Sequence, residues 1–254
     1  MCELFGASLK KETDLMALLK EFYSHCNRHP HGWGIMTGEN GKCRVIKEPV
    51  CASESSLLKR ELDNLSPQKN VLAHIRFATV GSLCAENAHP FTDYDNVGRR
   101  WTLIHNGTVY SDAEILKYMK IQQGQTDSER IFLYLIDNIN QAIKQAGGKL
   151  TIEQRFRILN ELVQRLSYRN KLNLMIFDGE VLYVHKNMHG TLFYYKSDNG
   201  YVFSTQPLGE GWRSFPLCKL EAFKDGEKIL DGERHEGLFI PTLEYITAMD
   251  AMNI

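Results

Sequence analysis

The sequence predicts an α+β fold in which antiparallel strands are covered by helices. Three observations favour this class. Residues 4–109 contain short apolar strands and two short helices. Residues 112–167 show mainly helical periodicity. From residue 171 the apolar residues recur with a period of two. Consecutive strands with short turns pair antiparallel, and blocks of strands, helices and strands are typical of this class. No internal repeat or low-complexity linker divides the chain, so we expect one domain over residues 1–254.

The first part of the chain is predicted to form strands and two helices. A strand over residues 4–9 precedes a helix that Thr13 or Asp14 can cap and that runs to about His25. Glu39-Asn40-Gly41-Lys42 is a hairpin signal between the strand that begins near residue 33 and a return strand over 43–47. An amphipathic helix over 54–65 and an apolar strand over 71–79 follow.

The second part is predicted to contain helices and then strands. A strand over 101–104 runs into His105-Asn106-Gly107, and a short helix follows over 112–120. Thr126-Asp127-Ser128-Glu129 has the spacing of a capping box that opens a helix to about residue 145, and Gly147-Gly148 separates it from a helix over 151–167. The expected strands then cover residues 171–178, 181–186, 191–195, 201–205 and 220–223.

Composition excludes several classes of protein. Thirty basic and 31 acidic residues leave a net charge of −1, so no basic excess indicates nucleic-acid binding. No apolar run approaches a membrane span of about 20 residues, and the N-terminus does not resemble a signal peptide. The six cysteines form no CxxC pair, which favours reduced thiols in a cytoplasmic protein. No nucleotide-binding motif is present, and we expect neither a cofactor nor a metal.

Cys2 directly follows the initiator Met1. Removal of Met1 would leave an N-terminal cysteine whose α-amine lies beside its own thiol, so one residue would carry both nucleophile and base. The alternative is a small apolar residue that opens the buried strand of Leu4-Phe5-Gly6-Ala7.

Three further polar stretches each have a functional and a structural interpretation. Arg76 lies in an apolar strand, where it can clamp a substrate carboxylate or extend to water. Asn106-Gly107 can supply two oxyanion donors or form a hairpin turn. Asp127 can accept hydrogen bonds from a substrate ammonium or belong only to a helix cap. A fourth stretch, residues 87–91, can be a plain loop.

Taken together, these stretches resemble the motif series of class II glutamine amidotransferase domains, which are N-terminal-nucleophile (Ntn) hydrolases. The matching stretches, which cover about residues 2–130, are Met1-Cys2 with Leu4-Phe5-Gly6, His31-Gly32-Trp33-Gly34-Ile35, His74-Ile75-Arg76-Phe77-Ala78-Thr79-Val80-Gly81, Asn87-Ala88-His89-Pro90-Phe91, His105-Asn106-Gly107 and Thr126-Asp127-Ser128-Glu129. Ser204-Thr205-Gln206-Pro207-Leu208 resembles the later part of the stand-alone members.

The resemblance implies a four-layer αββα sandwich with two antiparallel sheets between helices. It also implies that Cys2 is the nucleophile, that its α-amine is the base through a water, and that Asn106 and Gly107 form the oxyanion hole. Arg76 would bind the glutamine α-carboxylate with help from Thr79, and Asp127 would bind the α-ammonium.

One position departs from the family pattern. Stand-alone members often have Asp where this chain has His31, so the hydrogen bonding of that loop is open. The cluster of His25, Cys26, His29 and His31 also permits a metal site, with packed or solvated residues at a helix end as the alternative.

The expected function is hydrolysis of the γ-carboxamide of glutamine or of a γ-glutamyl peptide or amine, through a γ-glutamyl thioester. The expected partner is this small-molecule substrate; a separate synthase or peptidase subunit is compatible, and neither nucleic acid nor membrane is expected. The tail after residue 243 is too short for a synthase domain, which favours γ-glutamyl compounds over glutamine itself. The alternatives are a glutaminase subunit that delivers ammonia to a synthase chain, a non-catalytic glutamine-binding regulatory subunit, and a redox or metal-binding cysteine protein.

Overall fold

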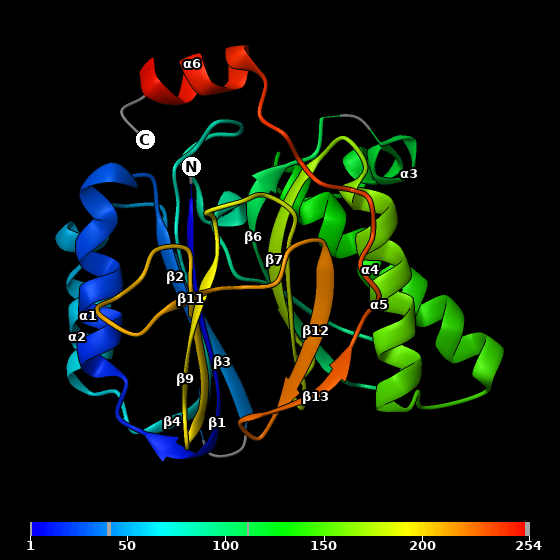
Figure 1. The fold of residues 1–254 in the computed structure, drawn as a ribbon, viewed down its shortest axis with the longest axis horizontal. Helices are drawn as coiled ribbons and strands as arrows, with labels where there is room; N and C mark the ends of the chain where they lie inside the picture. Colours follow the sequence, from blue (N-terminus) through cyan, green and yellow to red (C-terminus); the bar gives the residue numbers. More distant parts are fainter. Residues whose placement is uncertain (1, 40–41, 111, 252–254) are drawn as a thin grey trace.

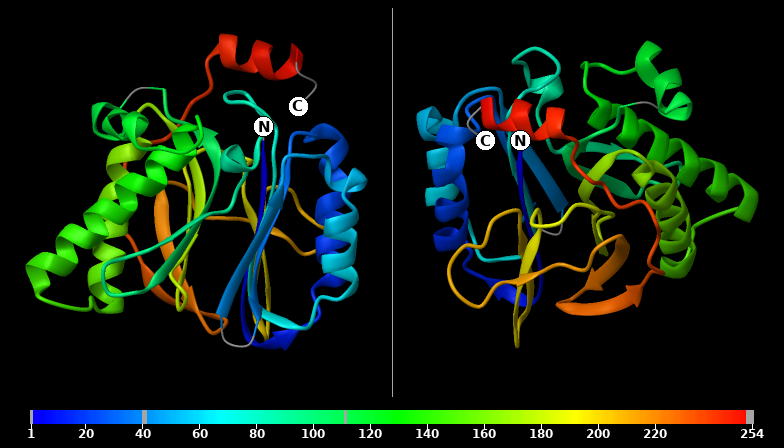
Figure 2. Two further views of the ribbon diagram at one scale, coloured as in Figure 1. Left: turned by 180° about the vertical axis from the view of Figure 1, so that it is seen from behind. Right: turned by 45° about the horizontal axis from the view of Figure 1, so that its top comes forward.

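The computed structural model describes residues 2–39, 42–110 and 112–251 of the chain. Two β-sheets stack face to face, and a layer of helices covers the outer face of each sheet, as Figures 1 and 2 show. This arrangement confirms the predicted α+β class and the four-layer αββα sandwich.

Both sheets are antiparallel, and strands that follow one another in the sequence do not always belong to the same sheet. Within the described residues, the first sheet has the order β11 (Arg213–Ser214), β9 (Phe193–Ser197), β10 (Gly200–Ser204), β1 (Glu3–Thr13), β4 (Gln68–Ile75), β2 (Trp33–Glu39) and β3 (Lys42–Glu48). The second has the order β13 (Glu227–Asp231), β12 (Lys219–Lys224), β8 (Leu182–Lys186), β7 (Lys171–Phe177), β6 (Arg100–Thr108) and β5 (Phe91–Tyr94). The strand that carries the N-terminus therefore lies inside its sheet, between β10 and β4.

The helices form two separate layers. The first sheet is covered by α1 (Met16–Ser24) and α2 (Ser56–Asp63), and the second by α3 (Ala113–Leu116), α4 (Asp127–Ala146) and α5 (Ile152–Ser167) (Figure 1). Short 3₁₀ turns are η1 (His25–Arg28), η2 (Ala52–Glu54), η3 (Ala85–Asn87) and η4 (Lys117–Lys120). A last helix, α6 (Leu243–Ala251), lies over the end of the sandwich where β1 begins (Figures 1 and 2).

None of the described helices is long and apolar enough to cross a membrane.

Three apolar clusters fill the spaces between the four layers. Side chains from both sheets, among them Leu4, Leu72, Ile104 and Met175, form the cluster between the sheets. One further cluster packs each sheet against its helices. Successive residues of β1 alternate between these clusters, since Leu4 faces the opposite sheet while Phe5 faces the helices. Both faces of the first part of β1 are thus buried, which explains why its sequence is a nearly continuous apolar run.

Two predicted strand boundaries were wrong, and both changes affect the candidate site. The strand predicted over 71–79 ends at Ile75 as β4, so Arg76 begins a loop. Asn106 and Gly107 are not a hairpin turn, because they lie within β6 and pair with Asn173 and Leu172 of β7.

Other predictions were confirmed in outline. The predicted hairpin forms, because β2 and β3 pair with Glu39 opposite Lys42, while its turn residues Asn40 and Gly41 lie outside the described residues. Helix α4 begins as predicted with Thr126 Oγ1 accepting from the Glu129 amide. The full capping box is not formed there, because the Glu129 carboxylate accepts instead from the Gln123 and Gly124 amides.

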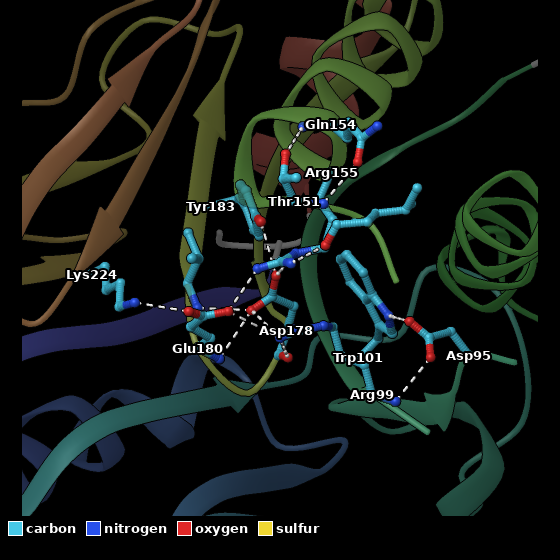
Figure 3. Close-up of polar contacts among 12 residues, drawn as sticks. Asp95, Arg99, Trp101, Thr151, Gln154, Arg155, Asp178, Glu180, Tyr183 and Lys224 are labelled. Atoms are coloured by element: carbon cyan, nitrogen blue, oxygen red, sulfur yellow. Dashed lines mark hydrogen bonds and ion pairs between the residues drawn. The ribbon is translucent and has the colours of Figure 1, made fainter. Parts of the chain in front are cut away.

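A buried ion-pair network fastens α5 to the second sheet (Figure 3). Arg155 of α5 donates from Nε to Asp178 Oδ2 at 2.7 Å and from Nη2 to Glu180 Oε2 at 2.8 Å. Tyr183 donates its hydroxyl to the same Asp178 oxygen at 2.9 Å, and Lys224 contacts Glu180. The Asp178 side chain is fully buried and that of Arg155 is 3% exposed, so each charge depends on the other.

Replacing Arg155 with methionine is expected to lower the free energy of unfolding by about 3 kcal/mol, because the buried Asp178 carboxylate loses the nearer of its two cations and keeps only Arg99, whose Nη1 lies 3.7 Å from Oδ1. Urea unfolding followed by circular dichroism measures the change. Arg157→Met is the matched control, since Arg157 is exposed on the same helix and its loss should change stability by less than about 0.5 kcal/mol. Equal stabilities of the two variants would contradict a structural role for the network.

Candidate active site

Cys2 directly precedes β1, whose first residues are held from both sides. The Leu4 amide donates to Thr205 Oγ1 at 2.8 Å, and the Thr205 amide donates to the Leu4 carbonyl at 3.0 Å. On the other side β1 pairs with β4, which leads into the loop of Phe77. The Phe77 amide nitrogen lies 3.4 Å from Cys2 Sγ and donates to it. The nucleophile candidate is therefore positioned by backbone contacts from two neighbouring segments.

Opposing effects act on the Cys2 thiol. Burial raises its pKa, because a thiolate loses solvation in the interior. The Phe77 amide and the charges of Arg76 and Lys171 lower the pKa in turn. This one donor and these two cations are the groups that would stabilise a thiolate at this position. The predicted removal of Met1 concerns a residue outside the described part of the chain.

Asn106 presents an unused hydrogen-bond donor in the interior. Its side chain is 2% exposed, and its Oδ1 accepts a hydrogen bond from Lys171 Nζ at 3.2 Å. Its Nδ2 is buried and has no acceptor among the described residues. Buried amide donors are normally paired, so this one is suited to an oxygen that only a substrate supplies.

Gly107 stands where β6 and β7 approach too closely for a side chain. A Cβ at this position would lie 2.0 Å from the Lys171 carbonyl oxygen and 2.3 Å from His105 Nε2. Any side chain would push β7 away and move Lys171 from Asn106.

Arg76 is a buried cation at the start of the loop that follows β4. Its side chain donates from Nη1 to the Ser82 carbonyl at 3.1 Å and from Nη2 to the Val80 carbonyl at 2.9 Å. The residue is 3% exposed, and it forms no ion pair with any carboxylate of the described residues. A guanidinium has five N–H donors, so these two bonds leave donors for an anion. Such a buried charge favours binding of an anionic group.

His31 supports the loop that follows Arg76. Its Nδ1 accepts a hydrogen bond from the Ala78 amide at 2.9 Å, and its own amide donates to the Arg76 carbonyl. Burial, with the nearby Arg76 charge, lowers the pKa of His31, which keeps the imidazole neutral and able to accept. This histidine therefore supplies the hydrogen-bond acceptor that an aspartate at the same position would supply.

Asp127 is the first residue of α4 and ties that helix to β6. Its Oδ2 accepts from the Val109 amide at 2.7 Å, and its neighbour Ser128 bonds His105 Nδ1 at 2.9 Å. These contacts lie on either side of Asn106-Gly107, so the carboxylate is held beside the end of β6. Thr79 is exposed and lines a cavity described below.

The histidines near the N-terminus bind a carboxylate instead of clustering around a common centre. His25 Nδ1 lies 2.9 Å and His29 Nε2 lies 3.1 Å from the two oxygens of Glu3. His31 is engaged with Ala78. Within the described residues, no group of three or more His, Cys, Asp or Glu side chains is placed to hold a metal.

Lys171 is a residue of this region that sequence reasoning missed, and it connects Cys2 with Asn106 and Gly107. Lys171 opens β7, is 1% exposed, bonds Asn106 and places its charge near Cys2. The signal available in the sequence was a lysine at the start of an otherwise apolar strand. Its meaning depended on pairing between β7 and β6, which the sequence did not reveal.

Comparison with known proteins gives consistent matches. The model for class-II glutamine amidotransferases matches residues 1–195. An uncharacterized protein of Methanocaldococcus jannaschii, MJ1515, is 30% identical over 97% of this chain and 76% of its own length. The Escherichia coli protein YafJ, a candidate glutamine amidotransferase, is 32% identical over 74% of this chain and 75% of its own.

The fold is also found in solved structures. A crystal structure of a predicted glutamine amidotransferase from Pseudomonas aeruginosa matches with a TM-score of 0.66 at 22% identity, covering 90% of this chain and all of that one. This likeness shows an Ntn-hydrolase-like sandwich. With the family model matching most of its length, this chain belongs to the class-II glutamine amidotransferases.

Proposed function

We propose that this protein is an N-terminal-cysteine amidohydrolase that attacks the γ-carboxamide of glutamine or of a γ-glutamyl peptide or amine. The observation that carries the proposal is the Asn106 side chain, whose Oδ1 is held by Lys171 while its buried Nδ2 has no acceptor among the described residues. A donor in this state, held by a lysine whose charge acts on the Cys2 thiol, suits a developing oxyanion.

The reaction follows from these groups. After removal of Met1, the Cys2 α-amine takes the thiol proton through a water, and Sγ attacks the γ-carbonyl carbon. Asn106 Nδ2 and the Gly107 amide donate to the resulting oxyanion. The tetrahedral intermediate then expels ammonia or an amine, which leaves with a proton from the base, and forms a γ-glutamyl thioester. Water adds to the thioester and releases glutamate and the thiol.

Recognition of the amino-acid end is assigned to two charges. Arg76 binds the α-carboxylate, which gives its buried guanidinium the anion that no described residue provides. Asp127 binds the α-ammonium, and Thr79 contributes to the carboxylate site. A zwitterionic amino acid requires one cation and one anion, and these residues supply them.

A large cavity, lined by neighbours of Arg76 and Asn106-Gly107 in the chain, supports a substrate that extends past the amide. Its volume is about 830 Å³, and its walls come from Thr79-Val80, Thr108, Tyr110, Tyr168-Arg169 and the segment from Glu236 into α6. Thr79 and Thr108 belong to the segments that carry Arg76 and Asn106-Gly107. The rings of Tyr110 and Phe239 stack with centroids 6.2 Å apart, and Phe239 meets Tyr245 at 5.4 Å. We therefore assign the aromatic part of the cavity, around Tyr110 and Phe239, to a leaving amine that bears a flat, apolar group, while its Thr79 wall belongs to the carboxylate site.

The test is a substrate panel with protein shown by mass spectrometry to begin at Cys2. Glutamine, γ-glutamyl-alanine, γ-glutamyl-phenylalanine and γ-glutamyl anilide are compared by glutamate release. We expect the aromatic amides to be cleaved with a higher kcat/KM than glutamine. Cleavage of glutamine alone, and only with a co-purifying chain, would favour an ammonia-delivering subunit. No release from any substrate would favour a non-catalytic glutamine-binding subunit.

A further inference from the structure

We propose that Lys171 is a positioning residue of the oxyanion hole: it fixes the orientation of the Asn106 amide and places a positive charge beside the Cys2 sulfur. This inference rests on the proposed function, in which Asn106 donates to the oxyanion and Cys2 attacks.

The hydrogen bond of Lys171 decides which end of the Asn106 amide faces the substrate. An ammonium has only donors, so the atom 3.2 Å from Lys171 Nζ must be the amide oxygen. The opposite end is then Nδ2, which is the buried donor that has no acceptor among the described residues. Without Lys171, the amide could rotate and point its oxygen at the developing negative charge. Asn106 would then repel the oxyanion it is assigned to stabilise.

The backbone makes this contact rigid. Lys171 lies opposite Thr108 in the pairing of β7 with β6, two residues beyond Asn106. Because Gly107 has no side chain, the two strands approach closely at that point. The lysine side chain is 1% exposed, so it reaches Asn106 through the interior and is not mobile in solvent.

The charge of Lys171 acts on the sulfur as well. The charges of Lys171 and Arg76 both lower the pKa of Cys2. The Lys171 charge also contributes to lowering the pKa of His105 on β6. Burial lowers the pKa of Lys171 to about 7, while the nearby Cys2 raises it. The ammonium therefore predominates below about pH 7 and is lost above it. Formation of the thiolate favours the charged lysine, and the charged lysine favours the thiolate, so the two titrations are linked.

The test compares Lys171→Met and Lys171→Arg with the unmodified enzyme, starting from protein processed to Cys2. With Met, kcat for the best substrate is expected to fall about 10²-fold with KM little changed, because the loss is felt in the transition state. With Arg, part of kcat should return, since a donor and a charge remain. In the unmodified enzyme, loss of the Lys171 charge should lower kcat as the pH rises through about 7. Lys171→Arg should not show this decline, because a guanidinium stays protonated.

A second readout does not need turnover. The rate of Cys2 alkylation by iodoacetamide is measured against pH, and Lys171→Met should shift its midpoint to higher pH. This shift in a protein that cleaves no substrate would mean that the proposed function fails while the charge effect of Lys171 stands. An unchanged alkylation profile together with an unchanged kcat would overturn the inference.

Two controls separate positioning from a general loss of structure. Lys186→Met removes another buried lysine, from β8 of the same sheet, where Nζ bonds the Leu192 carbonyl and Ser214 Oγ. It should lower stability without changing kcat or the alkylation profile. In an Asn106→Ala background, Lys171→Met should reduce kcat by much less than in the unmodified enzyme, because the amide that it orients is absent. Equal reductions in both backgrounds would contradict the positioning role.

Discussion

Replacing Cys2 with alanine is expected to abolish turnover of every γ-glutamyl substrate. The variant lacks the sulfur that attacks the carbonyl, and none of the other free cysteines stands at the start of β1 to replace it. Glutamate release from glutamine and from the preferred γ-glutamyl amide is the measurement. The fold should persist, because β1 is held by its pairing with β10 and β4 and by Thr205 and not by the thiol.

Cys43→Ala is the matched control, since this free cysteine lies on β3 and is only partly buried. It should retain full activity. Acetylation of the Cys2 α-amine should also sharply lower turnover, because the base is lost. Full turnover by protein that retains Met1, or by Cys2→Ala, would exclude the N-terminal-nucleophile mechanism.

Replacing Asn106 with alanine is expected to lower kcat by about 10²–10³-fold with little change in KM, which is the usual loss for one oxyanion donor. The backbone of β6 should continue to pair with Asn173 of β7, so we expect the loss to appear in the chemical step. Steady-state kinetics over a range of substrate concentrations separate kcat from KM.

A thermal melt of the same variant tests the structural alternative. Removing Asn106 takes away the acceptor seen for Lys171 Nζ, so some stability is lost in either case. Retained kcat with an earlier melt would mean that Asn106 serves only the packing of β6. Asn173→Ala is the control on the paired strand, where the amide bonds Thr191 at 2.9 Å and is assigned no part in catalysis.

Much of the candidate site was predictable because it consists of residue types placed in unusual local contexts. A cysteine after the initiator methionine, an arginine in an apolar stretch and an Asn-Gly pair between apolar runs each indicated chemistry when taken in order. The helices were also predictable, since α4 and α5 have strong apolar periodicity and are capped at their N-termini by Thr126 and Thr151. The roles of these residues remain predictions until the variants are measured.

Local patterns failed where long-range pairing decided the outcome. Asn106-Gly107 is a common turn signal, yet it lies inside β6 because β7 pairs along its whole length. The strand predicted to reach residue 79 stops at Ile75, and the Arg76 guanidinium donates to the Val80 and Ser82 carbonyls of the following loop. Consecutive strands β8 and β9 belong to different sheets, which no periodicity indicates.

By itself, the sequence determined the α+β class, the helices and the candidate nucleophile, cation and donor pair, because these depend on residue type and on neighbours a few positions away. Only the tertiary structure decided that Lys171 contacts Asn106, that Arg76 is buried without an acidic partner among the described residues, and that His31 supports the loop that follows Arg76. The two contacts join residues that are far apart in the sequence, and the state of Arg76 depends on its burial in the folded protein. Their energies arise from excluding water around charges that the folded sheets bring together.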